Sequence, residues 1–170
     1  TVKGQSVVNA IAQGDFIESM EIIAIGDQAK AFNAVEAFRT FEGAREKRLA
    51  EEKAVIEAEL DTLAKGFSKT ESGLRYQILQ QGQGKKAENN KTVAVHYKGQ
   101  LSEGTVFDSS YKRNQPIEFT LGQGQVIPGW DQGVALLTVG DKARFVIPSH
   151  LAYGSRGAGG VIPPNANLVF

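Results

Sequence analysis

The chain has 170 residues, with 19 Lys and Arg against 19 Asp and Glu, so its formal net charge at pH 7 is zero. A balanced charge argues against nucleic acid or an anionic membrane as the main partner, because both are bound through a surplus of basic residues. The chain has no cysteine, which excludes disulfides and thiolate chemistry. No apolar run approaches the length of a membrane span.

Residues 1–26 predict a small α/β piece. The segment "QSVVNAIAQG" has apolar residues at helical spacing and ends on Gly14, a common C-terminal stop. The segment "SMEIIAI" is typical of a strand. Together they resemble the last helix and last strand of a bacterial-type cyclophilin domain. No activity follows from this resemblance, because the catalytic arginine and aromatic residues of a cyclophilin would lie before Thr1.

Residues 27–66 predict one long connecting helix, with Asp27 as its N-cap. Apolar residues recur near both ends, and the middle segment "EGAREKRLAEEK" is almost entirely charged. This pattern is typical of a solvated helix that packs at its ends. A dimer seam is the alternative, which we favour less because the apolar repeat is too broken for sustained heptads.

Residues 67–73 include the polar run "SKTESG" and are expected to be a linker. From Leu74 onward, apolar residues alternate with other residues, and polar or glycine-rich breakers separate the stretches. The alternation predicts strands around residues 74–78, 93–97, 117–121 and 143–147. A short helix is expected at about residues 128–137. The predicted fold class is therefore α+β, an antiparallel sheet curled around a short helix, with Trp130 facing the concave side.

The usual sets of catalytic groups are poorly represented. The two histidines, His96 and His150, are far apart and have no evident metal partner, so we expect surface or hydrogen-bonded roles for them. The run Asp108-Ser109-Ser110 lacks the "GxSxG" turn of a serine nucleophile and is typical of the start of a loop. The segment "QGQGKK" lacks the spacing of a phosphate-binding loop. Nucleophilic, metal and cofactor chemistry are therefore not expected.

Bulky apolar residues instead gather in breaker-rich segments near short polar groups. They are Tyr97, Phe107 beside Asp108, Val126, Ile127, Trp130, Tyr153 and Ile162. Residues of this kind either fill a core or line a binding pocket. The pattern by itself leaves both interpretations open.

Five motifs of the C-terminal part occur in a characteristic order: "VHYKG", "VFDSS" followed by "RN", "VIPGW", "LAYG" and "IPPNA". In this order and spacing they resemble the FKBP family of peptidyl-prolyl cis-trans isomerases, over residues 74–170. The preceding helix and "SGLRYQIL" are similar to the bacterial Mip-like group. The resemblance implies a half-barrel sheet wrapped on a short helix, an FKBP-like fold. It also implies an isomerase that accelerates rotation of X-Pro bonds in folding polypeptides.

The resemblance also implies roles for individual residues. Trp130 would form the floor for a proline ring, and the Ile127 N–H and the Tyr153 hydroxyl would donate to substrate carbonyls. The implied catalytic residues are Tyr97, Phe107, Asp108 and Tyr153. The implied substrate-binding residues are Arg113, Ile117, Phe119, Val126, Ile127, Trp130, Val161, Ile162 and Phe170.

We expect no cofactor and no metal, because rotation about an X-Pro bond requires neither. The expected partners are proline-containing unfolded or partly folded polypeptides and macrolides such as tacrolimus or rapamycin, in a bacterial cytoplasm or periplasm. A chaperone or binding module that holds such clients without catalysis is the alternative.

Three positions depart from the common pattern of the family. Ile117 and Leu151 stand where aromatic residues are frequent, and Ala158 stands where eukaryotic members often have histidine. Substrate preference and macrolide affinity are therefore left open. The sequence stops at Phe170 before the last strand would normally finish, so we expect that part of the sheet to fray.

Overall fold

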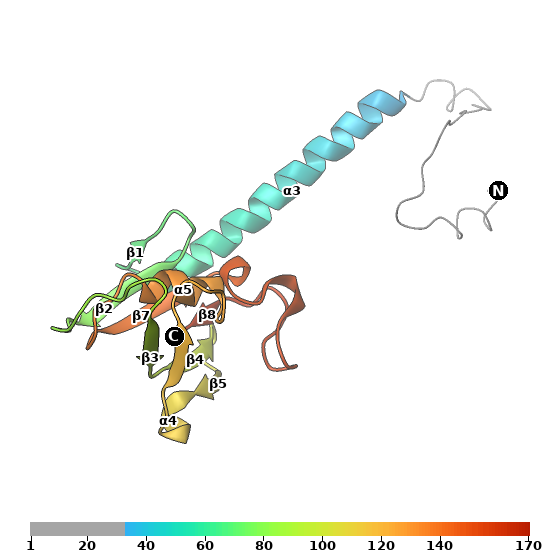
Figure 1. The fold of residues 1–170 in the computed structure, drawn as a ribbon. Coiled ribbons are helices and arrows are strands. Elements are labelled where there is room, and N and C mark those ends of the chain that lie inside the picture. The colour runs from blue at the N-terminus through green and yellow to red at the C-terminus, as the bar shows by residue number, and fades with distance from the viewer. Residues whose placement is uncertain (1–32) are drawn as a thin grey trace. The chain divides into compact units, whose positions relative to one another are not determined.

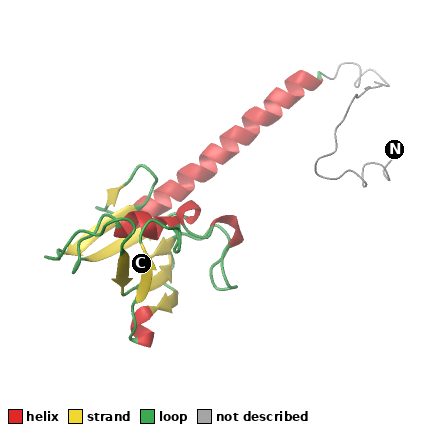
Figure 2. Ribbon diagram, viewed as in Figure 1, coloured by secondary structure: helices red, strands yellow, loops and turns green. Residues whose placement is uncertain are grey.

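The structure, a computed structural model, describes residues 33–170. The helix and strand expected within residues 1–26, and the cyclophilin resemblance, lie outside these residues. The chain divides into two compact units, Thr1–Arg48 and Leu49–Phe170, and the second carries all the strands described below. Figure 1 labels the elements, and Figure 2 shows that short strands and loops make up most of this unit.

The described helices are one long element and several short ones. They are α3 (Ala34–Leu63), α4 (Ser110–Arg113), α5 (Pro128–Val134) and the 3₁₀ turns η1 (Ser149–Leu151) and η2 (Gly154–Arg156). The strands are β1 (Ser68–Lys69), β2 (Arg75–Gln80), β3 (Thr92–Val95), β4 (Lys98–Leu101), β5 (Val106–Ser109), β6 (Ile117–Thr120), β7 (Lys142–Ile147) and β8 (Leu168–Val169). None of the helices in this part of the chain is long and apolar enough to cross a membrane.

The strands form two antiparallel sheets. The larger has the order β1-β2-β7-β8-β4-β5, and β3 pairs with β6 in a separate two-stranded sheet. The antiparallel α+β class predicted from the sequence is confirmed. The predicted strand at residues 93–97 is shorter than expected, because β3 ends at Val95 and Tyr97 lies between β3 and β4.

A single apolar core joins the sheets to the short helix α5. Alternation along β6 and β7 turns Phe119, Phe145 and Ile147 inward, where each is at least nine-tenths buried. Pro128 occupies the first turn of α5, a position that suits its fixed φ and its missing N–H. Trp130 and Val134 of α5 are part of the same core. Trp130 therefore faces the sheet, as the sequence predicted.

The last turns of α3 pack on the sheet. Leu60 and Ala64 form a small cluster with Val146 of β7, and Leu60 and Val146 are completely buried. Nearer its start, α3 exposes more than half of Val35 and Phe38. The expected N-cap Asp27 lies outside the described residues.

The residues expected as a linker contain strand β1. Ser68 and Lys69 pair with Tyr76 and Arg75 of β2, and Gly73 N–H donates to the Thr70 carbonyl. This segment therefore forms a hairpin with β2. Its turn ends on Gly73, whose φ of +92° is accessible chiefly to glycine.

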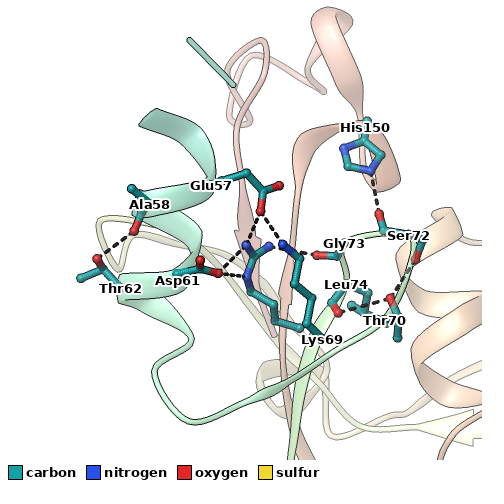
Figure 3. A network of polar contacts seen from close by, with 11 residues as sticks. Glu57, Ala58, Asp61, Thr62, Lys69, Thr70, Ser72, Gly73, Leu74 and His150 are labelled. Atoms are coloured by element: carbon teal, nitrogen blue, oxygen red, sulfur yellow. Dashed lines mark hydrogen bonds and ion pairs between the residues drawn. The ribbon is translucent and has the colours of Figure 1, made fainter. Parts of the chain in front are cut away.

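Arg75 departs from the alternation predicted for β2, because its side chain is only 2% exposed. Its guanidinium donates to Asp61 at 2.6 Å and to Glu57 at 2.8 Å, both on α3. Glu57 also accepts from Lys69, as Figure 3 shows. The period-two pattern missed this residue because a basic side chain can enter a core when its charge is paired.

Strand β8 lies inside the larger sheet, between β7 and β4. Phe170, directly after it, donates its N–H to the Phe145 carbonyl at 3.0 Å and accepts from the Phe145 N–H at 2.9 Å. The expectation of a frayed sheet at this point is therefore wrong. Leu168 and Val169 are paired on both sides and do not form an edge.

Candidate active site

The indole of Trp130 is surrounded by three aromatic rings. Tyr97 and Phe170 meet it edge-on, with ring centroids at 5.0 and 5.2 Å, and Phe119 lies tilted at 5.9 Å. Edge-to-face contact is a favoured arrangement, because the positive edge of one ring faces the negative face of another. Trp130 and Phe119 are buried, whereas Tyr97 and Phe170 are only partly buried. The cluster therefore extends from the core to the protein surface.

Phe107 of β5 extends this cluster. It meets Phe170 edge-on at 5.7 Å, and it too is only partly buried. The ring centroid of Tyr97 lies 6.2 Å from that of Phe170. The five rings come from five separate parts of the sequence, so the site exists only when β5, β6, α5, β8 and the residues between β3 and β4 have assembled.

The Trp130 Nε1 atom is buried and has no hydrogen-bond partner in residues 33–170. Leaving a buried donor unpaired costs roughly 1–3 kcal/mol, so folded proteins rarely do it. Each such group calls for an explanation, and a role in binding or catalysis is one of them.

A polar cluster lies beside the rings. The Tyr97 hydroxyl donates to Asp108, and Arg113 on α4 donates to Asp108 at 2.5 Å and to the Tyr97 hydroxyl at 2.9 Å. The Ser109 N–H adds a bond to Asp108 at 2.7 Å. Asp108 follows Phe107 on β5, where neighbouring side chains point to opposite faces. The carboxylate is therefore fixed from three directions while Phe107 joins the aromatic cluster.

These contacts change the acidity of both partners. The Arg113 hydrogen bond, and then the Tyr97 hydrogen bond, lower the pKa of Asp108 from 3.8 to about 2. Burial, and then the bond to the Asp108 carboxylate, raise the pKa of Tyr97 above its ordinary value. At neutral pH the site therefore holds an ionised carboxylate and a neutral phenol.

The aliphatic residues named from the sequence belong to the same hydrophobic core as Trp130 and Phe119. Val126, Ile127 and Ile117 pack against this core, and Ile162 is buried within it. Ile127 is the N-cap of α5, so its own N–H has no acceptor within the helix. That leaves a main-chain donor next to Trp130.

Two of the residues named from the sequence lie outside both the hydrophobic core and the polar contacts around Asp108. Tyr153 is 40% exposed and Val161 is 55% exposed. They lie at the two ends of a glycine-rich loop that Ala158 and Ile162 pin together through a pair of main-chain hydrogen bonds. The remaining named residues lie in the hydrophobic core, pack against it or take part in the polar contacts around Asp108.

Sequence reasoning missed two residues that shape the site. Ser110 is fully buried and its hydroxyl accepts a hydrogen bond from the Tyr97 N–H at 2.7 Å. Gly99 leaves room for two of the rings. The "DSS" run contains this serine, but such a run is common at the start of a loop and therefore did not indicate a function for it. In the described residues, no group of three or more His, Cys, Asp or Glu could hold a metal ion.

An antiparallel sheet packed on a short helix, with an aromatic cluster around the helix tryptophan, is the arrangement expected of an FKBP-type domain. The sequence model of the FKBP-type peptidyl-prolyl cis-trans isomerases matches residues 83–170. The chain belongs to this family and is a peptidyl-prolyl cis-trans isomerase of the FKBP type.

Individual relatives agree with this assignment. The chain is 52% identical over 104 residues to FK506-binding protein 2 of Yarrowia lipolytica, covering 61% of this chain and 72% of that protein. It is 63% identical over 86 residues to the peptidyl-prolyl cis-trans isomerase FPR2 of Saccharomyces cerevisiae, covering 50% and 64%.

A solved structure extends the likeness beyond the isomerase domain. The structure of FkpA from Escherichia coli is similar, with a TM-score of 0.62 and 37% identity, over 85% of this chain and 70% of that one. Such coverage reaches into the long helix before the domain. The Mip-like arrangement, a helix followed by an FKBP domain, is therefore confirmed.

Proposed function

We propose that the proline ring of an X-Pro substrate lies against the indole of Trp130. Tyr97, Phe107, Phe119 and Phe170 would form the aromatic walls around it. The observation that carries this proposal is the graded burial of the cluster, with a buried Trp130 at the base and partly exposed rings above it. A compact apolar ring without hydrogen-bond donors suits such surroundings.

The chemistry fits the groups that are present. Rotation about an X-Pro bond makes and breaks no covalent bond, and its barrier of roughly 18–20 kcal/mol reflects the loss of amide resonance. A site accelerates the rotation when it binds the twisted amide more tightly than the planar one. Each tenfold gain in rate requires about 1.4 kcal/mol of such preference. Removing water from the amide oxygen acts in this direction, because hydration favours the polar planar form.

The polar groups would hold the peptide while the preceding carbonyl turns. We assign the Ile127 N–H and the Tyr153 hydroxyl as donors to substrate carbonyls, and Asp108 as the charged group at the rim. Arg113 would keep Asp108 ionised and in place. Val126, Ile117, Val161 and Ile162 would contact the residues beside the proline.

The proposed catalytic domain comprises residues 74–170, preceded by the segment of residues 67–73 that carries β1 and by a connecting helix, of which the structure describes Ala34–Leu63. Packing of Leu60 and Ala64 on Val146 supports treating the end of the helix as part of the domain's own core. Proline-containing unfolded or partly folded polypeptides are the proposed substrates. Macrolides of the tacrolimus and rapamycin type are the proposed ligands of the aromatic cluster.

The test is the cis-to-trans rate of short X-Pro peptides in the presence of the wild-type chain and of Asp108→Leu. We expect Asp108→Leu to keep the fold and to lower turnover, since the carboxylate lies 40% exposed at the edge of the cluster. Glu118→Leu, which removes an exposed carboxylate from β6, is the matched control and should leave turnover unchanged. Undiminished activity in Asp108→Leu would remove this residue from the mechanism.

A macrolide arm tests the aromatic cluster itself. Tacrolimus or rapamycin should block turnover by the wild-type chain, and Trp130→Ala should lose both turnover and macrolide binding. A folded wild-type chain that binds proline peptides without accelerating their isomerisation would favour the client-holding module instead.

A further inference from the structure

The hydroxyl of Ser110 lies within hydrogen-bond distance of both the main-chain N–H and the main-chain carbonyl of Tyr97. Ser110 begins α4 and is completely buried. Its Oγ accepts from the Tyr97 N–H at 2.7 Å and lies 3.2 Å from the Tyr97 carbonyl oxygen, which also accepts from the Ser110 N–H at 3.0 Å. The mechanism outlined above does not use this contact.

The position of Tyr97 explains why such a partner is needed. Tyr97 lies between the end of β3 at Val95 and the start of β4 at Lys98, so its main chain is outside both strands. Buried main-chain groups require hydrogen bonds from elsewhere when a ladder does not supply them. Ser110 provides them through its own N–H and its hydroxyl.

His96 completes the bonding of this hydroxyl. Its Nδ1 lies 3.0 Å from Ser110 Oγ, and its ring stacks on Tyr111 of α4 at 5.0 Å with an angle of 16°. A serine hydroxyl has one hydrogen and two lone pairs. All three contacts are satisfied when His96 Nδ1–H and Tyr97 N–H donate to Oγ and the serine O–H donates to the Tyr97 carbonyl. In the other tautomer of His96, Nδ1 accepts from the serine hydroxyl instead, so the contact holds Ser110 in either tautomer.

The two ends of Tyr97 are consequently tied to one helix. Its main chain is bonded to Ser110, the first residue of α4, and its hydroxyl is bonded to Arg113, the last residue of α4. Arg113 also holds Asp108. A shift of Ser110 would therefore move the tyrosine ring and the carboxylate relative to each other and to Trp130.

We propose that Ser110 is a positioning residue for isomerisation, oriented by His96, which fixes the Tyr97 ring and the Asp108–Arg113 pair against the aromatic cluster. This inference rests on the proposed function of Tyr97 and Asp108. Ser110 touches no substrate in this arrangement. Its effect comes through the geometry of the groups that do.

The test compares Ser110→Ala with Ser109→Ala in the full chain. Ser109 is a matched control, because its hydroxyl is also nearly buried and reaches the same Tyr97 carbonyl at 3.3 Å but makes no bond to the Tyr97 N–H. Alanine at this position keeps the main-chain N–H that holds Asp108. We expect Ser110→Ala to lower kcat for X-Pro peptides about tenfold, since small displacements in an active site have effects of this order or larger. The KM should change by less than about twofold, because the rings that bind proline remain.

Fluorescence supplies a second readout. Trp130 is the only tryptophan in the chain and lies 5.0 Å from the Tyr97 ring, so its emission should change in Ser110→Ala and remain as wild type in Ser109→Ala. Unchanged emission together with a kcat within about twofold of wild type would overturn the proposal. An equal loss of kcat in both serine variants would also overturn it.

A surface variant keeps the proposal testable if Ser110→Ala fails to fold. His96→Phe retains the stacking on Tyr111 but removes the nitrogen next to Ser110, and it changes an exposed side chain. It should lower kcat in the same direction by about two- to threefold, and an unchanged kcat would overturn the proposal. Full activity of Asp108→Leu would instead refute the proposed role of Asp108, whatever the serine variants do.

Discussion

The main chain of Gly99 lies directly against the ring of Phe107. A Cβ atom at residue 99 would be 2.6 Å from the Cε2 and Cζ carbons of Phe107 and 2.9 Å from Cε1 of Phe170. The pairing register of β4 and β5 shifts at this glycine, as at a bulge where a strand is bent. The absence of a side chain at Gly99 is therefore what lets two aromatic rings approach the sheet.

Gly99→Ala should consequently damage the site more than the fold. The added methyl group would push Phe107 and Phe170 off their edge-on contact, because real side chains do not tolerate such short distances. We expect kcat/KM for X-Pro peptides to fall by about tenfold or more. Gly43→Ala is the control, since a Cβ there meets nothing within 4 Å and should leave kcat/KM unchanged. Wild-type kcat/KM in Gly99→Ala would contradict this interpretation.

The pH dependence of the site should reflect the low pKa of Asp108. The folded-state pKa of about 2 lies below the ordinary value of 3.8, so the ionised carboxylate stabilises the folded state above about pH 4. That contribution is lost as the pH falls from about 4 to about 2. Arg113→Gln removes the largest cause of the shift and should raise the pKa of Asp108 toward its ordinary value. Titration of the Asp108 carboxyl carbon by NMR measures this directly.

Lys112→Gln is a suitable comparison for Arg113→Gln, because it removes a neighbouring positive charge from α4 while the contacts of Asp108 remain. An Asp108 pKa that stays near 2 in Arg113→Gln would mean that Tyr97 and the Ser109 N–H suffice to hold the carboxylate.

The ion pairs of Arg75 predict an asymmetric response to mutation. The double variant Glu57→Gln/Asp61→Asn leaves a buried guanidinium without a countercharge, which should cost about 3 kcal/mol of unfolding free energy. Arg75→Met should cost less, because the two carboxylates it releases are partly exposed to water and a similar apolar volume stays in the core. Urea denaturation of the two variants distinguishes these effects, and a larger loss in Arg75→Met would refute the asymmetry.

The end of α3 should contribute strongly to stability. Leu60 is completely buried against Ala64 and Val146, so Leu60→Ala should lower the free energy of unfolding by about 2–4 kcal/mol. The same change at Leu49, which is 54% exposed on the same helix, should cost under about 1 kcal/mol. Equal losses at the two positions would show that burial does not determine the effect.

The sequence predicted those parts of the fold in which the local pattern and the tertiary contacts agree. Alternation along residues 117–121 and 143–147 identified β6 and β7, and the Pro-Gly pair before Trp130 located the short helix. The motifs of the C-terminal part supplied the family and the positions of the aromatic cluster. These features depend on neighbouring residues and can be seen in the sequence.

Features that depend on distant contacts were missed. The strand pattern predicts a solvent-facing side chain at Arg75, and its ion pairs with Glu57 and Asp61 explain why it is buried. The sequence indicates a loop residue at Ser110. Its hydrogen bond to Tyr97 arises because Tyr97 lies between β3 and β4, outside the strand pairing. The pairing of Phe170 with Phe145 likewise arises from the insertion of β8 between β7 and β4.

The position of β8 has a consequence for how the domain acquires its structure. The interior of the sheet is built from pairings between segments far apart in sequence, Arg75 with Val146 and Leu101 with Leu168. Non-local pairings slow folding, because the entropy of closing a long loop is lost before the contacts form. Strands that are distant in the sequence, such as β4 and β8, must therefore pair before the aromatic cluster can form. During synthesis the chain can complete the aromatic cluster only after β8 and Phe170 have been made.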